Sequence, residues 1–196
     1  VLITIKFMKK FKTIKINGDG WEGLVIQLEK EDDLDLLNLL EKYPEKYPFF
    51  LESSSRGNIQ NRNSIIFYKP KIVLKKGKSN KNFLDEFNLL WKKDRIFQDQ
   101  AIFKGKSIPF YGGWFVYLGY EIAKEIEKKL KIPNSPFLLP DAFAARVHSA
   151  VIYDHIDKTI IITSDKKKSS VEIDEIVCDL SSLKTKDTNI KSKGSV

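Results

Sequence analysis

At 196 residues, the sequence is long enough for one sizeable domain or for part of a larger protein. Its hydrophobic content of 42% and aromatic content of 12% are ordinary for a globular core and exclude wholesale disorder, while no apolar run is long enough for a membrane helix. The single cysteine, Cys178, excludes an internal disulfide and a cysteine metal cluster, and a reducing cytoplasm is the expected compartment.

The net charge of +8 suggests a nucleic-acid ligand, but the kind of basic residue argues against one. Of the 34 basic residues, 30 are lysines spread along the whole chain and only four are arginines. Arginine is the residue that makes bidentate and stacked contacts with bases and phosphates. A solvated lysine-rich surface is therefore favoured over a nucleic-acid site, and no membrane partner is expected.

The first elements follow one another closely. Residues 11–16 alternate with the period of a half-buried strand, and residues 23–28 predict a second, better buried strand after a turn at 18–20. Residues 32–43 then predict a helix, which Pro44 ends. Its apolar side chains recur every three residues, at Leu34, Leu37, Leu40 and Tyr43.

The middle of the chain repeats this pattern. Residues 64–77 contain two short strand runs, and Pro70 marks an edge or a bulge between them. Residues 80–93 predict a helix with Asn82 as its N-cap. The apolar stripe of this helix consists of Phe83, Phe87, Leu90 and Trp91.

Residues 108–123, "IPFYGGWFVYLGYEIA", predict a core strand that leads directly into a helix over 121–130. The two adjacent glycines permit backbone geometry and close approaches that other residues cannot make. Nothing in the segment is a nucleophile or a tuned acid, so it indicates scaffold rather than catalysis. The residues expected to line a shared core and pocket are Gly112, Gly113, Trp114, Tyr117, Gly119 and Tyr120.

The last part predicts a proline-rich loop, a hairpin that turns at residues 155–158, and a helix over 171–183. From residue 184 to 196 the chain has almost nothing to bury and indicates a polar linker. Residues 8–183 are the expected domain, and residues 1–7, before a plausible start at Met8, are expected to be an upstream artefact. Strands joined by short turns and interleaved with helices favour an α+β fold with antiparallel sheets.

Motifs with a known chemistry are missing from the sequence: there is no Walker loop, dinucleotide fingerprint, zinc spacing or nucleophile elbow. His148 and His155 lie seven residues apart across the predicted hairpin, which makes a catalytic or metal pair improbable. Asp154 and His155 are interpreted as a turn-stabilising aspartate and an exposed imidazole. No catalytic or metal-binding residue is expected in this chain.

The segment "FFLESSSRG", residues 49–57, allows two interpretations. Glu52 and the serines after it would suit the ammonium and carboxylate groups of a small zwitterion. The alternative is a strand end capped by serines, and the residues alone favour that alternative.

Four segments, taken in order, resemble the N-terminal region of the chorismate-utilising synthases, which include anthranilate synthase component I and aminodeoxychorismate synthase component I. They are "YPFFLESS", "NRNSIIFYKP", "PFYGGWFVYLGYEIAKEIE" and "LPDAFAARVHSAVIYDH", and the resemblance runs from about Leu37 to about Thr163. The "GGW" step, the "YLGYEIAKEIE" run and Arg146 are more similar to the aminodeoxychorismate branch than to the anthranilate branch.

The resemblance implies antiparallel sheets packed into a sandwich flanked by helices, incomplete without a C-terminal half. It implies an enzyme that converts chorismate and ammonia to 4-amino-4-deoxychorismate for para-aminobenzoate and folate synthesis. The C-terminal chorismate-binding domain would hold Mg²⁺ and the catalytic residues, and its proline-isoleucine-lysine-glycine-threonine motif is absent here. A glutamine amidotransferase subunit would supply the ammonia.

The resemblance also implies an amino-acid pocket, which binds tryptophan for feedback control in the anthranilate branch. Its residues carry over to Leu51, Glu52, Ser53, Arg62 and Ser64. Asn61 and Asn63 replace the glycine and the tyrosine of the family's Gly-Arg-Tyr-Ser run, so one aromatic wall for an indole is lost. A stand-alone amino-acid-binding module and a non-functional gene fragment are the other hypotheses.

Overall fold

Two antiparallel sheets make up the body of the molecule. The computed structural model describes residues 12–18, 20–27, 35–53, 62–76, 82–94, 102–133, 136, 138–165 and 170–183. The larger sheet has six strands, in the order β1 (Lys12–Gly18), β2 (Trp21–Gln27), β11 (Thr159–Ser164), β10 (Ser149–Asp154), β4 (Asn63–Tyr68) and β3 (Phe49–Leu51). The smaller sheet has three, in the order β5 (Lys71–Lys75), β9 (Ala142–Val147) and β8 (Gly113–Leu118). All their pairings are antiparallel, which confirms the predicted class.

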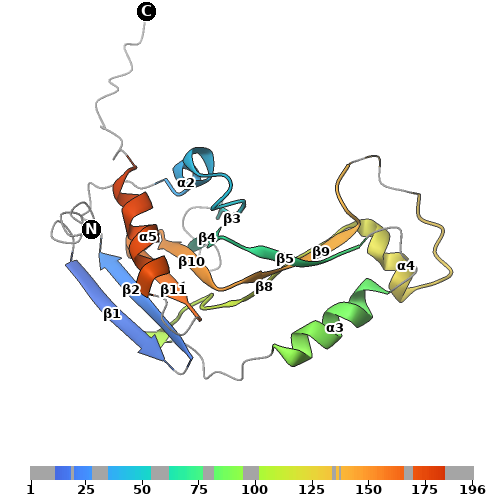
Figure 1. Cartoon of the computed structure of the whole chain (residues 1–196), viewed down its shortest axis with the longest axis horizontal. Helices are drawn as coiled ribbons and strands as arrows, with labels where there is room; N and C mark the ends of the chain where they lie inside the picture. The colour runs from blue at the N-terminus through green and yellow to red at the C-terminus, as the bar shows by residue number, and fades with distance from the viewer. Residues whose placement is uncertain are drawn as a thin grey trace, which may run out of the picture.

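One long ribbon connects the two sheets, because β4 continues into β5 and β9 continues into β10. Tyr68 pairs with Ser149 in the larger sheet, and Lys71 pairs with Arg146 in the smaller sheet, so the register is kept across the junction. Figure 1 shows β5 and β9 leading away from β4 and β10 as one curved strip. The break predicted at Pro70 separates β4 from β5.

Helices cover one face of the larger sheet. Helix α5 (Ser170–Ser181) and helix α2 (Leu37–Lys42) pack there over the largest hydrophobic core. The inward residues predicted for α5 are confirmed, since Ile176, Val177 and Leu180 are buried in this core. The strand β11 is buried along its whole length because it is central in the sheet and covered on both faces.

Helix α3 (Phe83–Lys93) packs on the smaller sheet, with Phe83 against Ala142 and Ala144. The predicted N-cap is confirmed, because the side chain of Asn82 accepts a hydrogen bond from the backbone N–H of Asp85 at 3.1 Å. Trp91 was expected in the buried stripe, but its side chain is 39% exposed, since it lies in the last turn of α3, beyond the side chains that pack on the sheet.

A second side chain caps α3 from outside the helix. The carboxylate of Glu125 accepts hydrogen bonds from the backbone N–H groups of Phe83 (3.1 Å) and Leu84 (3.2 Å), and it pairs with Lys76. Burial alone would raise the pKa of Glu125, but the hydrogen bonds from Lys76 and the two backbone groups lower it below its ordinary value. This contact ties α3 to the segment after β8.

A small hairpin covers part of the opposite face of the larger sheet. Its strands are β6 (Ile102–Phe103) and β7 (Lys106–Ser107), and Lys104 and Gly105 form the turn with φ values of 50° and 74°. Ile108, directly after the hairpin, is 3% exposed and belongs to a second core with Val25, Ile152 and Ile161.

The helix predicted over residues 121–130 is wrong in length. The chain forms a 3₁₀ turn, η2 (Tyr120–Ile122), and the short helix α4 (Ala123–Ile126). Ile126 and Leu130, expected on a buried face, are 76% and 45% exposed. A short amphipathic helix depends on packing for its stability, and this one ends where its apolar side chains are no longer covered.

The predictions for residues 1–7 and 184–196 lie outside the described residues. Within the described part of the chain, no helix is both long and apolar enough to span a bilayer.

Candidate functional site

The adjacent glycines lie at the junction of the two sheets, where β8 begins and β11 ends. Gly112 has φ +125°, and a Cβ atom built there would lie 2.3 Å from the Oδ2 atom of Asp165. The backbone conformation and the close approach both require glycine. The side chain of Asp165 thus leaves no room for any residue but glycine at position 112.

Arg146 on β9 is the centre of the junction. Its guanidinium pairs with Asp165 and Asp94, and it donates hydrogen bonds to the carbonyls of Gly113 (2.8 Å) and Val147 (2.6 Å). The Asp165 side chain is 1% exposed, so the buried carboxylate depends on this pairing. Arg146 therefore joins α3, β8, β9 and β11 at one point.

A histidine completes the junction. The Nδ1 atom of His148 lies 2.7 Å from Oδ1 of Asp165. A carboxylate can only accept here, so Nδ1 carries the hydrogen. With its charges paired, the cluster of Arg146, Asp165 and His148 holds the two sheets together.

The remaining residues of the glycine-aromatic segment have different surroundings. Trp114 packs edge-on against Phe87 of α3, on the helix-covered face of the smaller sheet. Tyr117 stacks with Phe143, with ring centroids 5.5 Å apart. A Cβ atom at Gly119 would lie 2.9 Å from the carbonyl oxygen of Asp141.

Tyr120 was expected to line the core, and the structure corrects this. Its side chain is 78% exposed, because β8 ends at Leu118 and the chain turns into η2.

The predicted amino-acid pocket lies at the end of the larger sheet, where β3 and β4 meet the turn at 155–158. The backbone N–H of Ser53 donates a hydrogen bond to Oγ of Ser64 at 3.0 Å. Leu51 and Glu52 are exposed beside them. The structure thus brings Ser53 and Ser64 into contact and leaves the other two residues at the surface.

His155 joins this pair, although the sequence indicated an exposed imidazole. Its Nε2 atom lies 2.7 Å from Oγ of Ser64, and its ring packs edge-on against Tyr153 at 4.8 Å. The signal lay in the register of β10 with β4, which pairs Tyr153 with Ser64, so that His155, two residues further on, lies on the same face as the serine. Asp154 has the predicted turn role, because it accepts hydrogen bonds from the backbone N–H groups of Ile156 and Asp157.

Arg62 is separated from the two serines. It precedes β4, and its side chain reaches Asp154 and Asp157 on the face of the sheet opposite α5. Burial by itself would lower the pKa of Arg62, but the hydrogen bond and the charge of Asp154 raise it above its ordinary value.

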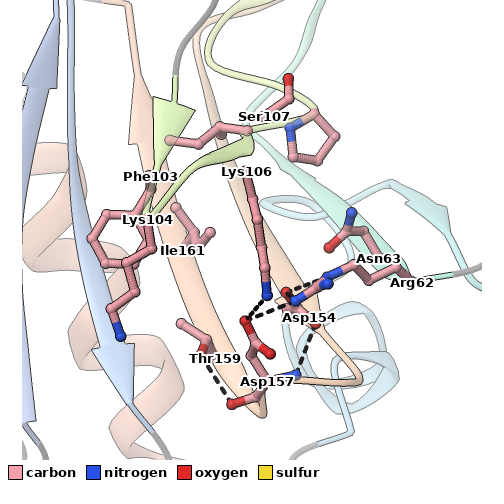
Figure 2. Close-up of a pocket in the computed structure, with 12 residues that line it drawn as sticks. Arg62, Asn63, Phe103, Lys104, Lys106, Ser107, Asp154, Asp157, Thr159 and Ile161 are labelled. Atoms are coloured by element: carbon pink, nitrogen blue, oxygen red, sulfur yellow. Dashed lines mark hydrogen bonds and ion pairs between the residues drawn. The ribbon is translucent and has the colours of Figure 1, made fainter. Parts of the chain in front are cut away.

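A cavity of about 240 Å³ lies beside Arg62, between the β6–β7 hairpin and the ends of β4, β10 and β11. Figure 2 shows Arg62, Lys106 and the two aspartates converging at one end of this cavity. Sequence reasoning did not find the cavity, because the hairpin that covers it is distant in the chain.

The polar groups of this region contact one another. Within the described ranges, no group of three or more His, Cys, Asp or Glu residues could hold a metal ion. The hydroxyl group of Ser64 contacts the ring of His155 at the end of β4, and Ser64 is 2% exposed.

No family model matches this chain. It is 26% identical over 168 residues to anthranilate synthase component 1 of Acetivibrio thermocellus. The aligned region covers 80% of this chain and 34% of that protein, so the chain spans about a third of the length of this relative. The similarity supports the relation to the chorismate-utilising enzymes that the motifs indicated.

Proposed function

We propose that this chain is the N-terminal, non-catalytic part of a chorismate-utilising enzyme, and that the enzyme is aminodeoxychorismate synthase component I. The ordered motifs support this, and so does a curated relative of which the chain covers about a third. The complete enzyme would convert chorismate and ammonia, supplied by a glutamine amidotransferase subunit, to 4-amino-4-deoxychorismate. The chain alone is expected to be inactive.

Mg²⁺ would be held by the rest of the enzyme. The described residues do not fit it, because no group of three or more His, Cys, Asp or Glu residues among them could hold a metal ion. We therefore assign this part no step that involves the metal.

The observation that carries the proposal is a stacked aromatic face on the side of the smaller sheet opposite α3, to which Phe49 of β3 in the larger sheet also contributes. Phe49 stacks on Phe115 with ring centroids 4.5 Å apart, and Phe143 stacks on Phe49 at 5.4 Å and on Tyr117 at 5.5 Å. All four side chains are only partly buried, and Ile72 beside them is 51% exposed. A contiguous aromatic surface of this kind is typical of an interface.

We propose that the C-terminal chorismate-binding domain packs on this aromatic face. The junction around Arg146 would then have a structural role. It fixes the angle between the two sheets, and this angle determines the orientation of the aromatic face.

The anthranilate branch is the second candidate, and the relative itself favours it, because that protein is an anthranilate synthase component 1. The two branches differ in the product, which is 4-amino-4-deoxychorismate in one and anthranilate in the other.

Activity of the reconstituted protein tests the proposal. The chain would be assayed with chorismate, ammonium and Mg²⁺, alone and together with the separately expressed C-terminal region of an aminodeoxychorismate synthase component I or of the Acetivibrio thermocellus enzyme. Product is expected only with a C-terminal region, and its identity distinguishes the branches. Turnover by the chain alone would refute the non-catalytic assignment.

A further inference from the structure

The cavity under the β6–β7 hairpin has a charged end and an apolar floor. Its floor is formed by Phe103, Ile108, Pro109 and Ile161. Its charged end consists of Arg62, Lys106, Asp154 and Asp157, which face one another in Figure 2. Since the serine pair lies on the other side of the sheet, this cavity is a separate candidate site.

The two carboxylates at the charged end are already engaged. The Oδ1 atom of Asp154 accepts two backbone hydrogen bonds from the turn, and its Oδ2 atom pairs with Arg62. The Oδ2 atom of Asp157 pairs with Lys106 at 2.6 Å and with Arg62 at 2.8 Å. The hydrogen bond from Lys106 lowers the pKa of Asp157, which keeps this carboxylate ionised. Three of the four carboxylate oxygens thus have partners, and the two cations beside them disfavour a ligand's ammonium group.

The groups at the charged end that can still interact with a ligand are hydrogen-bond donors. The ammonium group of Lys106 has three N–H donors, and its described contact is the one with Asp157. The amide of Asn63 also lines the cavity, and so does Lys104. The ammonium group of Lys104 points away from the charged end in Figure 2, so Arg62 and Lys106 balance the two carboxylates there. The groups left for a ligand are the remaining N–H donors of Lys106 and the amide of Asn63, and donors of this kind suit an anion.

The floor and the size restrict the rest of the ligand. Four apolar side chains form the floor, with Ile108 3% and Ile161 8% exposed. A volume of about 240 Å³ lies below the usual range for drug-sized ligands, so the ligand must be small. A flat ring on this floor would bury apolar area while its charged end reaches Lys106.

We propose that this cavity binds a small organic anion, a carboxylate on a flat apolar ring without an ammonium group. The carboxylate replaces Asp157 as the partner of Lys106 and Arg62. Asp157 is the group that can give way, because its side chain is 41% exposed and can turn to solvent. The β6–β7 hairpin, held by Ile108 in the core, forms the wall over the ring. The inference stands whether or not the chain belongs to a synthase.

Calorimetric titration with benzoate tests the inference, with benzyl alcohol and benzylamine as ligands of the same shape without the negative charge. Benzoate is expected to bind saturably and more tightly than either. Lys106→Gln should weaken benzoate binding roughly tenfold, as expected for a lost charge-assisted hydrogen bond. Asp157→Asn should strengthen it several-fold, because it removes the competing carboxylate. If the ion pair between Lys106 and Asp157 were merely structural, the two substitutions would not change the benzoate affinity in opposite directions.

Lys71→Gln is the matched control, since Lys71 is an exposed lysine on β5, away from the cavity. Circular dichroism and the urea midpoint of each variant check that the fold is kept, and Asn63→Ala provides a second donor deletion. The inference is overturned if benzoate gives no saturable heat, if benzylamine binds as tightly, or if Lys106→Gln and Asp157→Asn leave the affinity unchanged.

Discussion

Replacing Gly112 with alanine should destabilise the chain far more than an ordinary glycine substitution. A Cβ atom at this position would lie 2.3 Å from Oδ2 and 2.4 Å from Cγ of Asp165. Asp165 cannot simply move away, because its side chain is 1% exposed and pairs with Arg146 and His148. The substitution therefore strains the backbone and also displaces a side chain of the buried ion pair.

The magnitude follows from these two costs. A non-glycine residue in a backbone conformation of this kind costs about 1–3 kcal/mol. Separating a buried ion pair costs about 3–5 kcal/mol, because it leaves a buried charge without its partner. Since the methyl group meets Asp165 even when the strained backbone is kept, the backbone cost and part of the ion-pair cost add together, and we expect Gly112→Ala to lower the free energy of unfolding by about 3–4 kcal/mol.

Gly105→Ala is the matched control. Gly105 also has a positive φ, +74°, but nothing lies within 4 Å of a Cβ atom built there. Its cost is the backbone cost alone, about 1 kcal/mol.

Urea unfolding followed by circular dichroism and tryptophan fluorescence measures both variants, provided that the slope of the transition is the same. The reasoning would be refuted if the two alanines cost the same, or if Gly112→Ala cost less than about 1.5 kcal/mol. Either result would mean that Asp165 accommodates a methyl group without losing Arg146.

Two further predictions concern the helix cap and the predicted amino-acid pocket. Glu125→Gln should cost about 2 kcal/mol in urea unfolding, because hydrogen bonds from the N-terminus of α3 to a charged carboxylate are lost. The pKa of Glu125 is lowered on folding, so this contribution is present above the ordinary value of 4.5 and is lost as the pH falls through the folded pKa. The unfolding free energy of Glu125→Gln should accordingly fall less steeply with acid, and parallel acid profiles would contradict the assignment. Tryptophan should give no saturable heat in calorimetry, since Ser53 and Ser64 already contact one another. Saturable heat that disappears in Ser53→Ala would instead establish an amino-acid site.

Local patterns in the sequence were sufficient for much of the fold. The hairpin of β10 and β11 turns at the predicted residues because its strands are short, apolar and adjacent in the chain. Helix α5 and the cap at Asn82 follow from side-chain spacing and from one hydrogen bond within a turn. The helix expected over 121–130 was wrong because its length depended on packing partners that the periodicity could not reveal.

The site depended on contacts between distant residues. Arg62 and Ser64 lie two apart and would share one face of a regular strand, but Arg62 precedes β4 and its side chain follows Asp154 and Asp157 to the other side. Gly112 and Asp165 meet only because β8 and β11 approach the junction from different sheets. No spacing rule encodes such a meeting.

The central claim is tested most directly by analytical ultracentrifugation, which measures whether this chain associates with a C-terminal chorismate-binding region. A one-to-one complex is expected, and Phe143→Ser on the aromatic face should abolish it. Leu89→Ser, at a 69% exposed position on α3 across the sheet, should leave it intact. If no complex forms, or if Phe143→Ser and Leu89→Ser weaken it equally, the aromatic face is not the docking surface for the rest of the enzyme.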